Sequence, residues 1–559
     1  MSDVTTVDRP WLRFYEPGVP HTLSYPRATV QSLLDHSAAQ FGDRSAAVFF
    51  GAALSYRVLR ILVDRFAGAL HRLGVQPGDR VSLHLPNCPQ FLVAYYGALR
   101  AGAVVVPFNP LYVEREIEHQ LIDSAADVAV TLDLIYPRLA DARPRTRVRE
   151  VIVTSINAYF PPLLRWLYPL RARREGHLVR VPRGRGVHRF SDLLDAAEPA
   201  PQVAIEPERT AMLLYTGGTT GIPKGAMLSH RNVVCNVLQA RAWFTGLRPG
   251  QDSTLAVIPF FHSYGMTAAM NLSISAGARL ILLPRFQVEI VLGAIAKYRP
   301  QLFPGVPTLY TAIISHPHVA AYSLRSGMAC ISGAAPLPAE VQTRFEHLTG
   351  GKLVEGYGLT EASPVTHANP ISGLRKIGSI GVPFPDTDAR IMDGSGGRVL
   401  PPGEVGELVI RGPQVMQEYW NQPAETAQIL RDGWLFTGDL ARMDADGFFY
   451  IVDRKKEMII TGGLNVFPRE VEEVLYAHPG VLEAAAIGVR DPYRGEAVKA
   501  FVVLREGAHA TADEITEHCR RNLAPYKVPR AVEFRTQLPK SVVGKILRRV
   551  LMEEERGKY

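Results

Sequence analysis

Residues 80–132, RVSLHLPNCPQFLVAYYGALRAGAVVVPFNPLYVEREIEHQLIDSAADVAVTL, alternate short β-branched runs with longer amphipathic stretches. The runs at 80–85, 103–108 and 128–132 predict strands, and residues 89–101 and 114–124 predict the helices between them. Continuous apolar runs are typical of parallel strands that are covered on both faces. This stretch therefore predicts an α/β fold built on a parallel sheet.

The rest of the chain divides into two parts by its pattern. Further buried strands are expected at 148–154, 254–260, 279–284 and 328–333, whereas from residue 403 the runs ELVIRG, GFFYIVD and EMIITGG predict antiparallel hairpins. The tail predicts helices at 469–477 and 513–523 and a strand pair at 484–489 and 497–504. We expect a large N-terminal domain (1–453) of layered α/β subdomains plus a β-rich subdomain, and a small C-terminal α+β domain (457–559), with the boundary in the charged run at 453–456.

Composition excludes several classes of protein. The chain has 559 residues, of which 47% are hydrophobic and 21% charged, as in folded globular proteins. No apolar run reaches the roughly 20 residues of a transmembrane helix, and the N-terminus lacks the pattern of a signal peptide. The four cysteines lie far apart without a CxxC pair, so neither a disulfide framework nor a zinc site is predicted. A cytoplasmic location is expected.

The positive charge is concentrated in one segment. The net charge is +8, and residues 165–189 contain eight arginines against a single acid, Glu175. Because this excess is not spread along a face, nucleic-acid binding is not predicted.

The strongest chemical signal is YTGGTTGIPKG at 215–225, which follows the strand-like AMLLY. Its glycines let backbone N–H groups approach an anion, while its threonines and Lys224 add donors and a positive charge. The stretch is not a Walker A loop, because Pro223 stands where that motif requires glycine before the lysine. It therefore predicts a phosphate site of another class.

This string resembles the phosphate-binding signature of the adenylate-forming superfamily, which includes acyl- and aryl-CoA synthetases, luciferases and peptide-synthetase adenylation domains. The resemblance recurs in order along the chain, in SGAAPLP (332–338), EGYGLTEASP (355–364), GWLFTGDLARMDADGFFYIVDRKKEMIITGGLNVFPREVE (433–472) and LPKSVVGKILRR (538–549). It implies ATP, Mg²⁺ and CoA as reactants or cofactors.

The resemblance assigns roles to individual residues. The phosphates of ATP would be held by Thr216, Gly217, Gly218, Thr219, Thr220, Gly221 and Lys224; many relatives have serine where this chain has Gly217. Residues implied around the adenine and ribose are Gly333, Ala334, Ala335, Glu355, Gly356, Tyr357, Gly358, Thr360, Asp439, Ile451 and Arg454. Glu361 would be the magnesium ligand, which suits a hard cation that bridges phosphates.

Lys545 resembles the catalytic lysine that contacts the α-phosphate and the attacking carboxylate, and Thr216, Glu361 and His262 complete the expected catalytic set. The family also implies a hinge at 454–456, centred on Lys456, about which a mobile C-terminal domain swings between two half-reactions. One orientation would deliver Lys545, and the other would present Gly462 and Gly463 beside a tunnel for CoA.

The expected substrate is a long-chain fatty acid. Amino-acid-activating relatives place an aspartate after a core phenylalanine, but here His262 follows Phe261, so the counter-ion for an ammonium group is missing. YTGGTTG, PKSVVGKILRR and the segment around 109–130 resemble bacterial long-chain fatty acid–CoA ligases most. PFFHSYGM (259–266) and FPGVP (303–307) resemble parts of the acid-pocket wall.

Residues 159–189 lead to a hypothesis about a membrane partner. Residues 159–174, YFPPLLRWLYPLRARR, mix bulky apolar side chains with arginines, a pattern suited to an anionic bilayer interface. Peripheral contact with the inner face of a membrane is one interpretation; packing of the apolar residues into the domain, with solvated arginines, is the other. Pro161, Pro162 and Pro169 argue against one uninterrupted helix.

Several alternatives stay open at this stage. The chain could be a medium-chain or aryl acid–CoA ligase, a fatty acyl-AMP ligase that serves a carrier protein, a luciferase-like enzyme, or a non-catalytic basic protein that binds membranes or nucleic acid. The last reading leaves the ATP motifs unexplained. A homodimer is implied by the resemblance alone.

Overall fold

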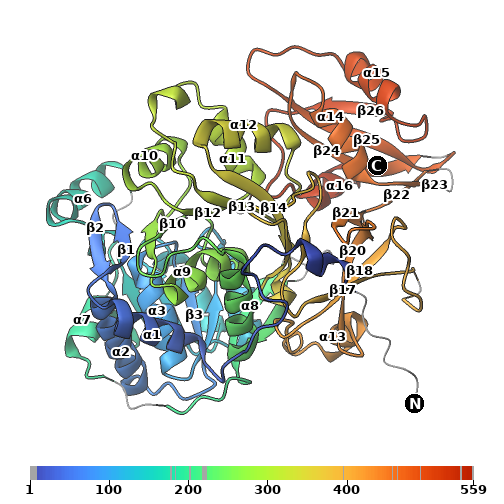
Figure 1. The fold of residues 1–559 in the computed structure, drawn as a ribbon. Helices are drawn as coiled ribbons and strands as arrows, with labels where there is room; N and C mark the ends of the chain where they lie inside the picture. Colours follow the sequence, from blue (N-terminus) through green and yellow to red (C-terminus); the bar gives the residue numbers. More distant parts are fainter. Residues whose placement is uncertain are drawn as a thin grey trace, which may run out of the picture.

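A computed structural model describes residues 9–176, 179–182, 184–199, 203–216, 223–394, 396–455, 457–461, 464–491, 493–541 and 544–556. Figure 1 shows an N-terminal portion of layered sheets and helices, and a smaller C-terminal portion on one side of it. The expected fold class is confirmed.

The first sheet contains the stretch at 80–132. Across the sheet its strands are β7 (Val187–Arg189), β6 (Glu150–Thr154), β5 (Val128–Leu132), β3 (Arg80–His84), β4 (Val104–Pro107), β8 (Thr210–Thr216) and β9 (Lys224–Ser229). Neighbouring strands are parallel except for β8 and β9, which form an antiparallel hairpin. In the sequence, the predicted phosphate loop connects these two strands.

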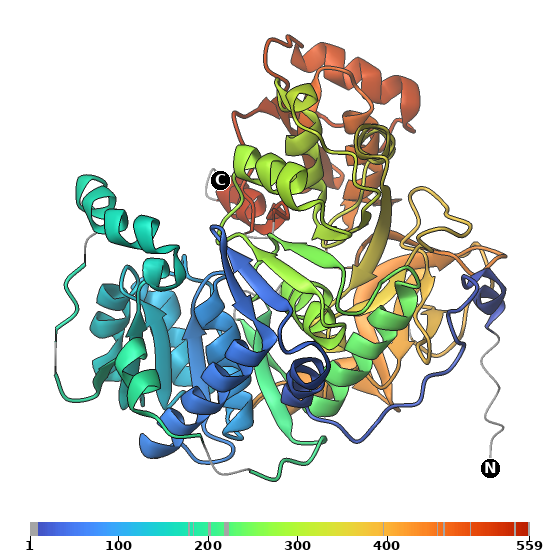
Figure 2. The same ribbon diagram turned by 60° about the vertical axis from the view of Figure 1, so that its left-hand side comes forward.

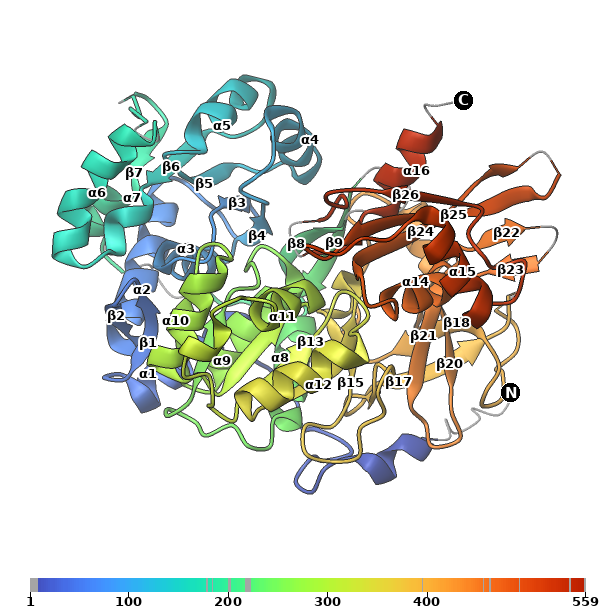
Figure 3. The same ribbon diagram turned by 90° about the horizontal axis from the view of Figure 1, so that it is seen from above.

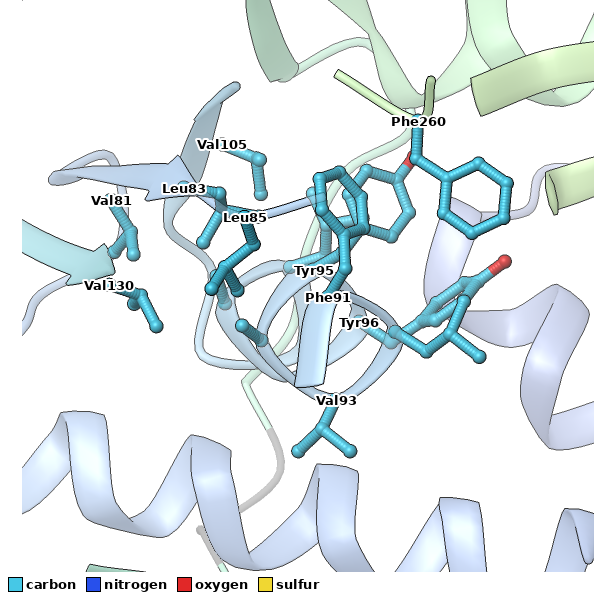
Figure 4. Close-up of a cluster of buried hydrophobic side chains, with 14 of the residues drawn as sticks. Val81, Leu83, Leu85, Phe91, Val93, Tyr95, Tyr96, Val105, Val130 and Phe260 are labelled. Carbon is cyan, nitrogen blue, oxygen red and sulfur yellow. The ribbon is translucent and has the colours of Figure 1, made fainter. Parts of the chain in front are cut away.

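Helix α3 (Pro89–Arg100) joins this first sheet to a second one. Figure 4 shows Val81 and Leu83 from β3 in one cluster with Phe91 and Tyr95 from α3, and with Phe260 from the segment that follows β10 of the second sheet. All five side chains are buried. A helix that is apolar on every side belongs between layers, and α3 fills that position.

The second sheet is also mostly parallel. Its order is β16 (Val382–Pro383), β15 (Val365–Ala368), β14 (Lys352–Gly358), β13 (Ala329–Ser332), β12 (Leu302–Gly305), β10 (Ser253–Ala256), β11 (Arg279–Leu282), β1 (Ser45–Phe49) and β2 (Ala52–Ser55). The strands from β14 to β1 run parallel, while β2, β15 and β16 add antiparallel pairs at the two edges. The carboxyl ends of β10, β12, β13 and β14 therefore meet at one edge.

The third sheet is antiparallel, as the turn-rich sequence predicts. It contains β17 (Asp388–Met392), β18 (Gly406–Arg411), β20 (Trp434–Met443) and β19 (Leu430–Arg431), with β21 (Phe449–Arg454) paired to β20. Pairing of β20 with β21 places Asp439 opposite Arg454.

The C-terminal domain has its own sheet and core. The sheet consists of β23 (Leu464–Val466), β22 (Ile459–Thr461), β25 (Gly495–Leu504), β24 (Val481–Asp491) and β26 (Ala531–Phe534), and the helices are α14 (Pro468–Tyr476), α15 (Ala512–Asn522) and α16 (Arg548–Arg556). Figure 3 shows the domain beside the antiparallel sheet.

The remaining helices belong to the N-terminal portion. They are α1 (Val30–Phe41), α2 (Tyr56–Arg72), α4 (Glu114–Ser124), α5 (Tyr136–Ala142), α6 (Pro162–Arg174), α7 (Phe190–Ala196), α8 (His230–Trp243), the π-helical η4 (Gly265–Asn271), α9 (Leu272–Ser275), α10 (Val288–Tyr298), α11 (Pro307–Ile314), α12 (Ala339–Thr349) and α13 (Pro423–Ile429). Among the described residues, none of the helices is long and apolar enough to cross a bilayer.

Two expectations need correction. The strand predicted at 254–260 ends at Ala256, and the residues beyond it lead into the site. The prediction that prolines rule out one uninterrupted helix over 159–174 is correct at Pro161 and Pro162, where α6 begins, and wrong at Pro169, through which α6 continues. Pro169 has no N–H for the carbonyl of Arg165, four residues earlier, and the Asn157 side-chain amide donates to that carbonyl at 3.3 Å instead.

Candidate active site

The predicted site residues gather where parallel strands end. His262 follows β10, Gly333 follows β13, and Thr360 and Glu361 follow β14. These strands are close neighbours in one sheet, so their carboxyl ends bring distant parts of the sequence together. Open α/β sheets characteristically bind ligands at this edge.

Tyr264 packs against the glycine of the SGAAPLP motif. Tyr264 donates its hydroxyl to the Ile331 carbonyl at 2.6 Å, and its ring would lie 3.4 Å from any Cβ added at Gly333. Gly333 also donates its N–H to the Gly305 carbonyl at 3.1 Å. Ala334 is exposed with φ +67°, and Ala335 is half-buried. The motif is thus a tight turn held against the sheet edge.

His262 is a neutral group in this site. Burial, reinforced by the positive charge of Lys545, lowers the pKa of His262 to about 4. Its Nδ1 accepts a hydrogen bond from the Tyr264 backbone N–H at 3.2 Å. Since Nδ1 is the acceptor, the ring proton lies on Nε2, which leaves a hydrogen-bond donor and no charge at neutral pH.

Asp439 forms the centre of a hydrogen-bonded group. Its Oδ2 accepts from the Tyr357 hydroxyl at 2.6 Å, and its Oδ1 accepts from Nε of Arg454 at 3.1 Å. The Asp439 carboxylate raises the pKa of the Arg454 guanidinium, and burial raises the pKa of Tyr357 well above its usual value. Tyr357 therefore stays a hydrogen-bond donor, and the carboxylate is held in one orientation.

Tyr419 links two other predicted residues. Its hydroxyl donates to Oε1 of Glu361 at 2.5 Å, and Nζ of Lys224 lies 5.4 Å from the centre of its ring. Lys224 also forms an ion pair with Glu425. Tyr419 and Glu425 lie outside the motifs and carry no signal in a single sequence that would have identified them.

Lys545 reaches the site from the C-terminal domain. Burial and the nearby Arg454 lower the pKa of its ammonium group to about 8, although the Asp439 carboxylate acts in the opposite direction. The preceding Gly544 has φ +77°, and a Cβ there would lie 2.4 Å from Oγ1 of Thr308 on α11. Gly544 and Lys545, which we call the lysine loop, thus lie directly against the N-terminal domain.

Other predicted residues have different surroundings. Glu355 is buried within β14, and burial raises its pKa to about 7 despite the nearby Arg469. Gly356 is buried where a Cβ would lie 3.0 Å from the Ile331 side chain, so packing accounts for this glycine. The Ile451 carbonyl accepts from Arg469 at 2.6 Å.

Three more assigned residues are described near the ends of β8 and β14, and eight others lie outside the described residues. Gly358 is exposed, and Oγ1 of Thr360 lies 3.2 Å from Oγ of Ser263. Thr216 ends β8 opposite Lys224. The predictions for Gly217, Gly218, Thr219, Thr220, Gly221, Lys456, Gly462 and Gly463 fall outside the residues that the structure describes.

Comparison with known families decides the assignment. The model of the AMP-binding enzyme family matches residues 34–420, and that of the AMP-binding enzyme C-terminal domain matches residues 470–545. The chain belongs to the AMP-binding enzyme family. The two matches agree with the large and small portions of the fold, and the resemblance stated from the motifs is confirmed.

Individual members of the AMP-binding enzyme family are similar over almost the whole chain. The long-chain-fatty-acid–CoA ligase of Bacillus subtilis strain 168 is 49% identical over 550 residues, which cover 98% of each chain. A feruloyl-CoA synthase from an Amycolatopsis species is 39% identical over 500 residues, covering 89% of this chain and 93% of that protein. The crystal structure of the anthranilate CoA ligase AuaEII with anthranoyl-AMP superposes with a TM-score of 0.84 at 26% identity, covering 95% and 98% of the two chains.

Proposed function

We propose that this AMP-binding enzyme is a long-chain fatty acid–CoA ligase. The fatty acid carboxylate attacks the α-phosphorus of ATP to give acyl-AMP and release pyrophosphate; the sulfur of CoA then attacks the acyl carbon and AMP leaves. The observation that carries this proposal is the 49% identity to the B. subtilis ligase over 98% of both chains.

The charges at the site suit the first step. A carboxylic acid is already ionised at neutral pH, so its attack needs no general base. The Lys545 ammonium supplies positive charge where the phosphate and carboxylate would meet, and His262 is a neutral donor nearby. We propose that Asp439, oriented by Tyr357 and Arg454, accepts the ribose hydroxyls.

Mg²⁺ is proposed to bind through Glu361. Within the described residues, the only hydrogen bond to the Glu361 carboxylate is at Oε1, and no three His, Cys, Asp or Glu side chains form a metal cluster. A single carboxylate, that of Glu361, fits Mg²⁺, which commonly takes one or two carboxylates together with substrate phosphates. When bound, the ion neutralises phosphate charge.

The second step is proposed to use a rotated C-terminal domain. The domain division at 1–453, 454–456 and 457–559, the hinge at Lys456, and the contacts of Gly462 and Gly463 with CoA are parts of this proposal. In support of the hinge position, Arg454 is the last residue of β21, and the C-terminal core begins with β22.

The test is CoA-dependent AMP formation across a series of acids from acetate to oleate, with coumarate and ferulate included. We expect AMP release to peak between twelve and eighteen carbons and to require CoA. A peak at short or aryl acids would replace the substrate while keeping the mechanism. Because the chain is similar to a feruloyl-CoA synthase, ferulate is the aryl acid that most needs testing. AMP release that ignores CoA would indicate a fatty acyl-AMP ligase serving a carrier protein.

The proposal extends to location and assembly. We propose a cytoplasmic enzyme with peripheral contact at the inner face of the membrane; all four cysteines are buried and unpaired, which suits a reducing compartment. A homodimer, implied by the family, stays a prediction that sedimentation velocity can test.

A further inference from the structure

Helix α6 turns its apolar side away from the protein. Leu163, Trp166, Leu167 and Leu170 are 67%, 73%, 39% and 60% exposed. Their spacing of i, i+3, i+4 and i+7 places them on one face, which we call the outer face of α6. Ala172 on the opposite side is buried. In an ordinary surface helix the apolar face would lie against the core.

Aromatic side chains hold α6 in this position. Phe160, just before the helix, has its ring centre 5.6 Å from that of Tyr168 and 4.6 Å from that of Phe50, at the tip of the hairpin between β1 and β2. Phe50 is itself 43% exposed, which extends the apolar surface onto the hairpin. Figure 2 shows α6 standing out at the edge of the molecule. Together with the exposure of its leucines and Trp166, this position leaves the outer face accessible to a large partner.

Arginines are exposed along α6 and in the residues that follow it. Arg171 and Arg173 flank the outer face and Arg174 lies on it, whereas Arg165 is exposed on the side of Ala172. Arg180, Arg185 and Arg189 are exposed further along the same segment. Arg171 pairs with Glu175 at 2.7 Å. Arg165, Arg173 and Arg174 form no ion pair with any residue that the structure describes. Apolar and positively charged surface are therefore exposed side by side.

We propose that the outer face of α6 and its flanking arginines dock the enzyme onto an anionic lipid bilayer. Leucines and a tryptophan enter the boundary between headgroups and acyl chains in helices of this type, and each basic residue near an anionic surface strengthens binding by about fivefold. A second copy of the chain is a poorer occupant, because a two-fold interface would bring the same arginine cluster close to itself. The inference rests on the proposed function, since long-chain fatty acids partition into membranes.

The experiment sediments the full chain with phosphatidylcholine vesicles and with vesicles rich in phosphatidylglycerol. We expect binding to the anionic vesicles only. A charge variant (Arg171→Glu, Arg173→Glu, Arg174→Glu) and an apolar variant (Leu163→Ser, Trp166→Ser, Leu170→Ser) should each reduce that binding about tenfold or more. The charge-matched control is the set Arg325→Glu, Arg520→Glu and Arg521→Glu, exposed on other elements, and it should bind nearly as well as the wild type.

Two further measurements separate the outcomes. Ligase activity on detergent-dispersed fatty acid should stay unchanged in both α6 variants; if the wild type itself lacks that activity, the proposed function fails while vesicle binding is judged independently. Sedimentation velocity without lipid reports self-association. Unchanged vesicle binding in the two variants, or a dimer that they dissociate, would overturn membrane docking.

Discussion

At the scale of single residues, the candidate site depends on charges held partly out of water. Asp439 is fixed by Tyr357 and Arg454, and Lys545 lies in their electrostatic field. The motifs identified all four residues from the sequence. Their hydrogen-bond partners and the neutral state of His262 depend on the folded structure, because burial and neighbouring charges set them.

The pKa of Lys545 predicts a pH dependence for ATP binding. The ammonium form carries the charge that attracts phosphate, and its pKa of about 8 means that this charge is lost as the pH rises through 8. ATP affinity of the free enzyme, measured by calorimetry, should fall above that pH. The Lys545→Arg variant should not share the fall, because arginine stays protonated throughout. Identical profiles for the two proteins would contradict the assigned role.

Replacement of Tyr357 tests the orientation of Asp439. Tyr357→Phe removes a hydrogen bond to a carboxylate, which is worth about 1.5–3 kcal/mol. We expect KM for ATP to rise about tenfold or more with kcat nearly unchanged, as when binding is lost equally in the ground and transition states. Tyr450→Phe is a matched control, because Tyr450 donates to Asp444 at 3.2 Å outside the site. Equal effects of both changes would argue against a specific role.

At the scale of elements, Gly544 of the lysine loop lies against the start of α11, where only a glycine fits without a clash. A Cβ at Gly544 would meet both Oγ1 of Thr308 and, at 3.5 Å, Cγ2 of Val306. We therefore expect Gly544→Ala to slow acyl-AMP formation about tenfold or more while leaving thioester formation from supplied acyl-AMP nearly intact.

The control for that prediction is Gly507→Ala. Gly507 has φ +76° and open space around it, so alanine there has the same unfavourable backbone conformation without the collision. Rapid-quench measurement of the two half-reactions distinguishes the variants. If Gly507→Ala slows acyl-AMP formation as much as Gly544→Ala does, the close contact between Gly544 and the start of α11 has no catalytic importance.

The elements themselves were largely predictable. Helices α3, α4 and α14 and strands β3 to β6 lie within two residues of the expected bounds, because apolar periodicity and turn residues are local signals. The full length of helix α6 was not predictable, because a proline inside a helix, here Pro169, normally breaks or kinks it. The Asn157 side chain, in the short turn just before α6, donates to the Arg165 carbonyl that Pro169 leaves without a partner, and hydrophobic periodicity does not reveal such a side-chain contact.

At the scale of the whole molecule, the two domains are held in the arrangement that presents Lys545. Arg548 on α16 contacts Asp453 at 3.3 Å and Glu472 at 2.5 Å, so it joins the end of β21 to α14. Arg505 lies 3.9 Å from Glu340 on α12. The motifs predicted which residues would react, but not this orientation, because contacts between domains leave no periodic pattern in one sequence.

The most direct test of the account is the separation of half-reactions in Lys545→Ala. Acyl-AMP formation from palmitate and ATP should fall by about a hundredfold or more, as expected when a charge that stabilises the transition state is removed. Conversion of supplied palmitoyl-AMP and CoA to palmitoyl-CoA should stay within a few fold of the wild type. Equal loss of both half-reactions would contradict the assignment of Lys545 to adenylation alone.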